Sequence, residues 1–162
     1  MKTLRFPLLL ALAGTSLLAT SCFDKDKEAA KPKTPTELLV GKDWKLTACT
    51  VSPAKLTASG RTSTDYYNDL MASYDRDDLI RFEKPDVARQ DEGPTRAPGT
   101  TTQVYNGTWS LTEDDKVLNT NLEVLGRSSY DVLELSDNTL RTSGWRTEAG
   151  TRYTYTYTFT KQ

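Results

Sequence analysis

The most regular pattern in the chain is a strict alternation of aromatic residues and threonines at its C-terminal end, in the segment RYTYTYTFT (152–160). Successive side chains of a β-strand point to opposite faces, and aromatic and β-branched residues both favour strands. We therefore predict a closing strand that pairs with residues 138–146 on one edge and with a strand around Trp44 on the other. The side chains expected to face inward are those of Tyr153, Tyr155, Tyr157 and Phe159.

Shorter segments with the same period of two recur between turn sequences. In the first, Trp44, Leu46 and Ala48 share one face and Cys49 lies on the other. Further strands are expected in DDLIRFEK, DVARQDE, QVYNGTWSL, KVLNTNLEV, SSYDVLEL and NTLRTSGW. The inward face of SSYDVLEL is ambiguous, because its adjacent Val and Leu point opposite ways. About eight short antiparallel strands at steady spacing predict an all-β sandwich or up-and-down barrel.

One segment after the first strand has the period of a helix. Within STDYYNDLMASY, one apolar stripe is formed by Tyr67, Leu70, Met71 and Tyr74. Thr64 or Asp65 is placed to cap the N-terminus of this helix. We expect one short helix that lies against the sheet or across its opening.

The N-terminal segment has the composition of an export signal. Basic Lys2 and Arg5 precede an apolar stretch, which is followed by small residues and Cys22. Such a stretch is typical of a secretory signal and too short for a spanning helix. The arrangement resembles the lipobox of bacterial lipoproteins, which implies cleavage after residue 21 and acylation of Cys22. We assign residues 1–21 to the signal peptide, 22–37 to a charged, proline-bearing tether and 38–162 to the domain.

Charge and residue usage narrow the function classes. The net charge is −1, without a basic run, which makes nucleic acid a poor partner. The sequence contains no histidine and, apart from Cys22, one cysteine, Cys49. We expect Cys49 to be a small buried residue, because a catalytic thiol needs a neighbouring base. Without a nucleophile and base, a phosphate loop or a metal-binding cluster, we predict a protein that is not an enzyme and has no cofactor.

Three carboxylates gather in the segment YDRDDL, at Asp75, Asp77 and Asp78. Carboxylates at this density are the kind of ligand that Ca²⁺ takes, but the glycine and distal glutamate of a calcium loop are missing. Arg76 also lies between them. We therefore expect a solvated corner between helix and strand, with no metal site.

The chain resembles the lipocalin-like lipoprotein domains of Gram-negative bacteria over roughly residues 38–160. The resemblance is carried by Gly41 and Trp44, then by DRDDLIRF, EG, NGTWSLTEDDKVL, YDVLELSDNTL and YTYTFT, in one order along the chain. It implies an eight-stranded up-and-down barrel with an internal ligand cavity. Lipocalins open with one residue between glycine and tryptophan, whereas here there are two. The cysteine pair of many such lipoproteins is also absent, so no disulfide holds the loop at 93–102.

Two functions are compatible with such a barrel. It binds a small apolar molecule in a cavity, or it is filled by its own side chains and acts as an interaction or structural module for an envelope protein. The candidate lining residues are Trp44, Leu46, Phe82, Tyr105, Trp109, Tyr153, Tyr155, Tyr157 and Phe159. Phe23 follows Cys22 where an aspartate is the usual inner-membrane signal, so we expect anchoring of the acylated chain in the outer membrane, on its periplasmic or surface face.

Overall fold

The structure is a computed structural model that describes residues 31–122 and 128–162. The chain divides into two units, Met1–Lys31 and Pro32–Gln162. The expected signal peptide and Cys22 lie outside the described residues, as does part of the segment KVLNTNLEV. The second unit is the domain considered below.

The described residues of this domain form strands with three short helical segments. The helical segments are α1 (Pro35–Leu39), α2 (Tyr66–Asp69) and the 3₁₀ turn η1 (Ser73–Asp75). The strands are β1 (Asp43–Leu56), β2 (Thr62–Asp65), β3 (Leu79–Glu83), β4 (Val87–Asp91), β5 (Val104–Thr112), β6 (Val117–Thr120), β7 (Ser128–Leu135), β8 (Thr139–Glu148) and β9 (Thr151–Lys161).

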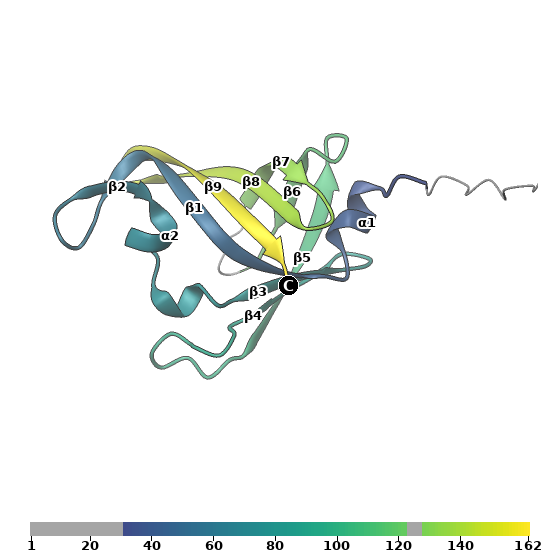
Figure 1. The fold of residues 1–162 in the computed structure, drawn as a ribbon, viewed down its shortest axis with the longest axis horizontal. Helices are drawn as coiled ribbons and strands as arrows, with labels where there is room; N and C mark the ends of the chain where they lie inside the picture. Colours follow the sequence, from purple (N-terminus) through teal and green to yellow (C-terminus); the bar gives the residue numbers. More distant parts are fainter. Residues whose placement is uncertain (1–30, 123–127) are drawn as a thin grey trace, which may run out of the picture. The chain divides into compact units, whose positions relative to one another are not determined.

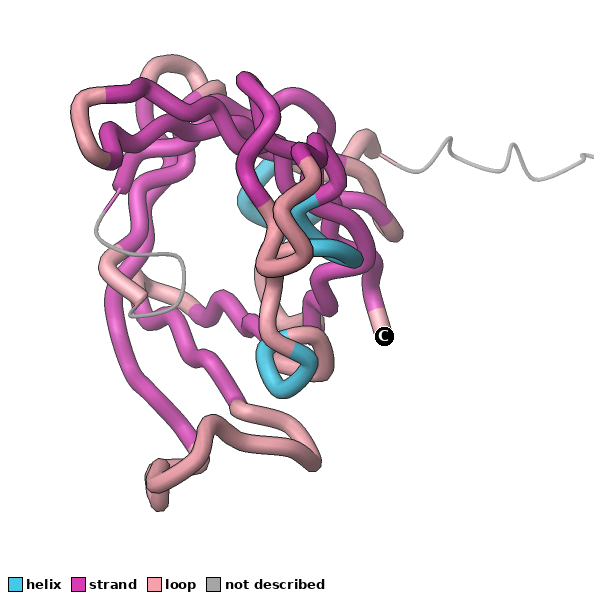
Figure 2. Tube along the Cα trace, turned by 90° about the vertical axis from the view of Figure 1, so that its left-hand side faces the viewer, coloured by secondary structure: helices cyan, strands magenta, loops and turns pink. Residues whose placement is uncertain are grey.

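The strands close into an antiparallel barrel, as predicted. Their order is β2-β1-β3-β4-β5-β6-β7-β8-β9, and β1 also pairs with β9, so β1 and β3–β9 form a closed ring of eight. The extra strand β2 pairs with the distal part of β1. Figure 2 shows the strands running around a common interior, and Figure 1 shows α1 and α2 at opposite ends of the barrel. Closure leaves no open sheet edge on the ring.

The C-terminal strand β9 is the closing strand and faces as predicted. It pairs with β8 over Thr139–Glu148 and with β1 over Trp44–Ser52. The rings of Tyr155, Tyr157 and Phe159 are buried and stacked in sequence, with interplanar angles of 20°. The threonines between them are partly or fully exposed. The alternation therefore reflects a dry interior on one side of β9 and solvent on the other.

In β1 the predicted faces are wrong beyond Leu46. Ala48 is exposed and Cys49 is 1% exposed, the reverse of strict alternation from Trp44. The β1–β9 register shifts between Leu46 and Ala48, where a bulge inserts one residue. A bulge moves every later side chain to the other face, which places Cys49 and Val51 inside. A second register shift, between Val132 and Glu134 in β7, explains why the inward face of that segment was ambiguous.

The helix after the first strand is shorter than predicted. Asp65 caps α2 by accepting from the backbone N–H of Asn68, but α2 ends after one turn. Arg76 Nη2 donates to the carbonyls of Asn68 and Met71, which satisfies backbone groups that a longer helix would use internally. A two-turn stripe is too short to sustain a helix without such help, so tertiary contacts decide its conformation.

Helix α1 was not anticipated, although it has a clear local signature. Thr34 accepts from the N–H of Glu37, whose carboxylate accepts from the N–H of Thr34, and Pro35 opens the first turn. These are the features of a capping box with proline at the first helical position. Residues 35–37 of the expected tether therefore belong to a helix, which ends at the fully buried Leu39.

Candidate functional site

One end of the barrel interior, next to α1, is filled by side chains; we call it the filled end. Trp44 is 0% exposed, and its Nε1–H donates to the carbonyl of Leu39 over 2.9 Å. The void at this end measures about 10 Å³, close to the least space that holds a single water. It is lined by Trp44, Ile80, Phe82, Leu118, Tyr130, Leu140, Thr142 and Phe159.

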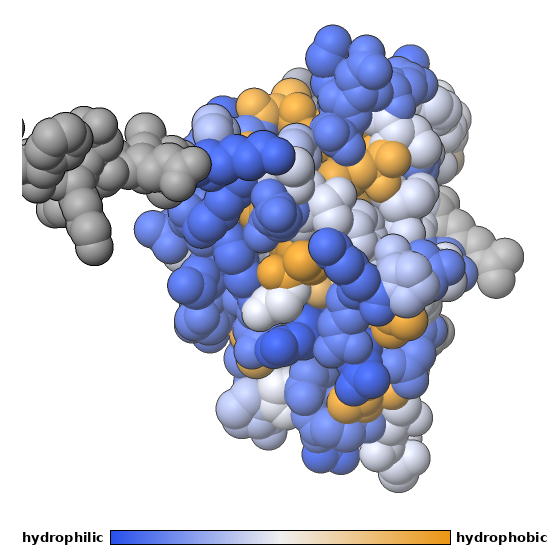
Figure 3. Space-filling model, turned by 90° about the vertical axis from the view of Figure 1, so that its right-hand side faces the viewer, coloured by the Kyte–Doolittle hydropathy of each residue, from blue (hydrophilic) through white to orange (hydrophobic). Residues whose placement is uncertain are grey.

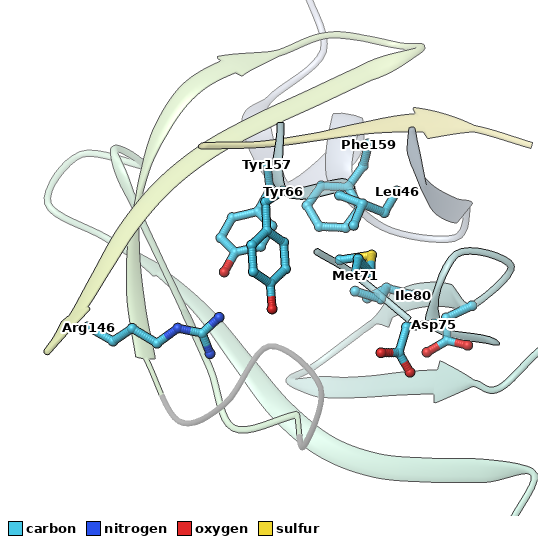
Figure 4. Close-up of a pocket in the computed structure, with 9 residues that line it drawn as sticks. Leu46, Tyr66, Met71, Asp75, Ile80, Arg146, Tyr157 and Phe159 are labelled. Carbon is cyan, nitrogen blue, oxygen red and sulfur yellow. The ribbon is translucent and has the colours of Figure 1, made fainter. Parts of the chain in front are cut away.

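The other end of the interior, next to α2, contains a cavity of about 120 Å³; we call it the cavity end. Its lining residues are Leu46, Tyr66, Met71, Asp75, Asp78, Ile80, Arg146, Tyr157 and Phe159 (Figure 4). An apolar protein cavity of about 150 Å³ is large enough for benzene, whereas sites for drug-sized ligands occupy about 300–1,000 Å³. The space therefore suits a molecule built on a single small ring.

Helix α2 and the segment after it form one wall of the cavity. Tyr66 packs edge-on against Tyr155, with ring centroids 5.2 Å apart. The Tyr155 hydroxyl donates to Glu148 Oε1 over 2.7 Å and accepts from Lys55 Nζ over 3.1 Å. Because these contacts join β1, α2, β8 and β9, they hold this wall against the barrel.

The most unusual group in the cavity is the carboxylate of Asp78. The residue is only 6% exposed, and its Oδ2 accepts from Gln90 Nε2 over 3.1 Å. Its Oδ1 is buried and has no hydrogen-bond partner among the described residues. Burial, reinforced by the negative charges of Glu92, Asp75 and Asp77, raises the pKa of Asp78 to about 7. Our expectation of a solvated corner is therefore wrong for Asp78.

Two more carboxylates share this environment. Glu92 is 5% exposed and accepts from Gln90 Nε2 over 2.9 Å. Burial raises the pKa of Glu92, and burial together with the charge of Asp77 raises the pKa of Asp75. Asp77 itself is engaged elsewhere, because it accepts from the N–H and the hydroxyl of Thr95. These two bonds hold the loop at 93–102 in the absence of a disulfide.

A cation lies on the opposite side of the cavity from this carboxylate group. Figure 4 shows the Arg146 guanidinium and the Asp75 carboxylate on either side of the rings of Tyr66 and Tyr157. Arg146 Nε is 3.0 Å from Glu148 Oε1, and its guanidinium lies 4.2 Å from the centre of the Tyr155 ring. The positive charge of Arg146 is thus already partly balanced by Glu148.

The structure divides the nine predicted lining residues between different places. Leu46, Tyr157 and Phe159 line the cavity, while Trp44 and Phe82 lie at the filled end. Tyr155 and Trp109 are buried but line neither interior space, and Trp109 instead packs against Phe82 and donates to the carbonyl of Glu83. Tyr105 and Tyr153 are partly buried and line neither space.

The lining residues that sequence reasoning missed are mainly polar. Asp78, two residues before Ile80, shares the inward face of β3, and Arg146 follows Leu140 at even spacing in β8. Both residues would have been predicted if the inward face had been extended at every second position. We instead ended the predicted inward face of each strand at its last apolar residue. Tyr66 was missed because the predicted helical stripe contained its neighbour Tyr67.

Other candidate chemistry is weaker. Cys49 is buried, and burial raises the pKa of its thiol to about 12. Within residues 31–122 and 128–162, no group of three or more Cys, Asp or Glu residues is arranged to hold a metal ion. Across those same ranges, no helix has the length and apolar character needed to cross a bilayer.

Comparison with known proteins adds no further assignment, since the chain matches no protein-family model and no curated protein.

Proposed function

We propose that this chain is a lipid-anchored protein of the bacterial cell envelope whose barrel binds one small, largely apolar molecule. The observation that carries the binding part is the cavity of about 120 Å³ at one end of the barrel, whose other end contains a void of only about 10 Å³. Apolar side chains with a few convergent polar groups are typical of small-molecule sites. The size of the cavity supports a ligand with one small ring and argues against a long acyl chain.

The anchoring part of the proposal rests on the sequence before the barrel. Two or more acyl chains on Cys22 hold a protein stably on a membrane. Replacing Cys22 with serine should therefore move the protein from the membrane fraction to the soluble fraction. If the variant stays with the membranes, the anchor is wrong while the binding proposal is unaffected.

The proposed function is binding rather than catalysis. The sequence has no histidine, and the thiol of Cys49 is buried with its pKa at about 12, so it is not a nucleophile near neutral pH. The Oδ1 atom of Asp78 is a hydrogen-bond acceptor without a donor among the described residues, and a bound ligand can supply that donor.

The alternative, an interaction module, has one observation in its favour, namely the filled end. Such a module also needs a coherent exposed apolar patch. The exposed large apolar residues among the described positions lie on four different strands: Leu56, Val104, Leu133 and Trp145. On the face shown in Figure 3, hydrophobic residues form small separate groups among hydrophilic ones. The binding function is therefore favoured.

Native mass spectrometry of the gently purified full-length chain tests this proposal. We expect a bound small mass that is lost in Met71→Phe, because the larger ring occupies the cavity. Leu56→Phe is the matched control, since Leu56 is 68% exposed and its replacement leaves the cavity unchanged. The binding function is overturned if no mass is bound and ring-sized probes also fail to raise the melting temperature.

A further inference from the structure

The charge distribution inside the cavity points to the chemical class of the ligand, and this inference rests on the proposed binding function. We propose that the cavity takes a protonated amine carried on a small aromatic or apolar body, with Asp78 as the counter-ion.

Asp78 has one oxygen engaged in a hydrogen bond and one without a partner. Gln90 occupies Oδ2, while Oδ1 is fully buried without a partner among the described residues, and the residue lines the cavity. Buried polar atoms in folded proteins almost always have a hydrogen-bond partner. Oδ1 itself has almost no accessible surface, so a donor inside the cavity would satisfy it once the Asp78 side chain turns toward the cavity that the residue lines. The ligand therefore carries an N–H or O–H group at this side.

The charges around Asp78 favour a cationic donor over a neutral one. The charges that act on Asp78 are those of Glu92, Asp75 and Asp77, which are all negative, while the cations Arg96 and Lys45 act on Glu92 and Asp77. A positive charge in the cavity would be attracted mainly by Asp78 and Asp75, which line it, in surroundings that screen charge weakly. An ammonium group also supplies several N–H donors, enough to contact more than one carboxylate oxygen.

The rest of the cavity fits the body of such a molecule. Leu46, Met71, Ile80 and Phe159 offer apolar contact, and the rings of Tyr66 and Tyr157 present surfaces that a nearby cation also favours. The volume of about 120 Å³ admits one ring with a short amine-bearing arm.

The opposite wall does not favour an anionic ligand to the same degree. Arg146 is exposed and is paired with Glu148, whereas Asp78 is buried and lacks an opposite charge. An ion pair with an exposed and already compensated arginine contributes little. The geometry thus favours recognition of the positive end of the ligand.

Titration calorimetry of the full-length chain with three probes of one shape tests the inference. Benzylamine, benzyl alcohol and benzoate share a ring and differ in charge. At pH 8 we expect benzylamine to bind about 10- to 100-fold more tightly than benzyl alcohol, the range of a hydrogen bond to a charged group. Benzoate should bind more weakly than either.

Two variants locate the effect. Asp78→Asn should remove the preference for benzylamine while benzyl alcohol still binds, which shows that the cavity is intact. Asp77→Asn is the matched control, because its carboxylate is held by Thr95 and does not line the cavity. It should change benzylamine affinity by less than about threefold, as changes at outlying charges do.

Three other results of the calorimetry would each contradict the proposal in a different way. Equal affinities for benzylamine and benzyl alcohol leave the binding function standing and refute the preference for a cation. Tightest binding of benzoate refutes it in favour of recognition by Arg146. If none of the probes binds, both the preference and the binding function are wrong.

Discussion

The two ends of the barrel interior differ in chemistry although the same strands build both. Along each of three strands, the inward side chains change from apolar at the filled end to polar at the cavity end. In β3 and the residue before it, the order is Phe82, Ile80 and Asp78. In β4 and the residue after it, the order is Ala88, Gln90 and Glu92; in β8 it is Leu140, Thr142, Gly144 and Arg146. This change along the strands separates stability from function. The apolar side chains at one end stabilise the fold, while the other end contains buried charged groups that lower its stability.

Close packing at the filled end extends to the backbone. Tyr130 lies directly over Gly144, where an added Cβ would come within 2.5 Å of the ring. This approach lets Tyr130 meet Tyr157 edge-on at 5.7 Å. Substitution of Gly144 would push the ring away, so the residue is glycine for space and not for backbone conformation.

The largest expected difference between the ends concerns truncation of buried side chains. Phe82→Ala at the filled end should lower the free energy of unfolding by about 3–5 kcal/mol, because it empties a packed position 1% exposed. Met71→Ala at the cavity end should lower it by less than about 2 kcal/mol, since Met71 is partly exposed and already borders empty space. Urea denaturation of both variants measures the contrast. Equal losses would mean that both ends are packed alike.

The second prediction concerns the stability penalty of the buried carboxylate. The pKa of Asp78 is raised to about 7 from 3.8, so between about pH 4 and 7 the folded state keeps a proton that the unfolded chain releases. Its contribution to the free energy of unfolding therefore falls as the pH rises through this window and is constant above it. At pH 8 the penalty is at most about 4 kcal/mol, three pKa units at about 1.36 kcal/mol each.

Asp78→Asn removes this penalty and isolates it from the neighbouring groups. Glu92, Asp75, Asp77 and Gln90, which face Asp78, remain in both proteins. The variant should be more stable than the parent at pH 8, and the difference should largely vanish near pH 4. Denaturation at both pH values gives the comparison. A difference independent of pH would show that Asp78 is not buried in its charged form.

The filled end and the apolar lining of the cavity were largely predictable from the sequence, and the polar lining of the cavity was not. Alternation of apolar and polar residues gave the eight strands of the ring but not β2, and it gave the closure of β9 onto β1 and β8 and the inward face of β9. Each of these depends on burial of apolar side chains, which the order of residues reports directly. The bulge at Leu46–Ala48 escaped because it depends on the partner strand, which local periodicity does not contain.

The polar lining of the cavity was not predicted, for a different reason. Inward positions at a site carry polar residues, so a pattern read from hydrophobicity ends where the site begins. Asp78 and Arg146 keep the two-residue spacing of the inward positions of β3 and β8, but they are charged and not apolar. Whether rings fill or line a barrel also depends on three-dimensional packing, which is why the sequence left both possibilities open for Trp44 and Phe82.

The third prediction concerns the hydroxyl that joins the walls of the cavity end. Tyr155→Phe removes the bonds to Glu148 and Lys55 while leaving the buried ring and the contact between Lys55 and Glu148 in place. We expect a loss of about 1–2 kcal/mol, since a hydrogen bond to a charged group is involved. Thr156→Ala, one residue along and turned toward solvent, should lose under about 1 kcal/mol. A larger loss for Thr156→Ala would mean that β9 faces the other way.

The smallest expected effect is at Cys49, which lies on β1 opposite Tyr157, one of the rings that line the cavity. Cys49→Ala should lower the free energy of unfolding by about 1 kcal/mol or less, because it removes one small buried group. The native thiol should also react slowly with an alkylating reagent, since it is 1% exposed and burial raises its pKa to about 12.

Peptide mass spectrometry separates its labelling from that of Cys22. Slow labelling that accelerates in urea would mean that the Cys49 thiol becomes accessible only when the whole domain unfolds. Rapid labelling of the native protein would instead show that the cavity end opens while the filled end stays folded, which would extend the difference between the two ends from packing to motion.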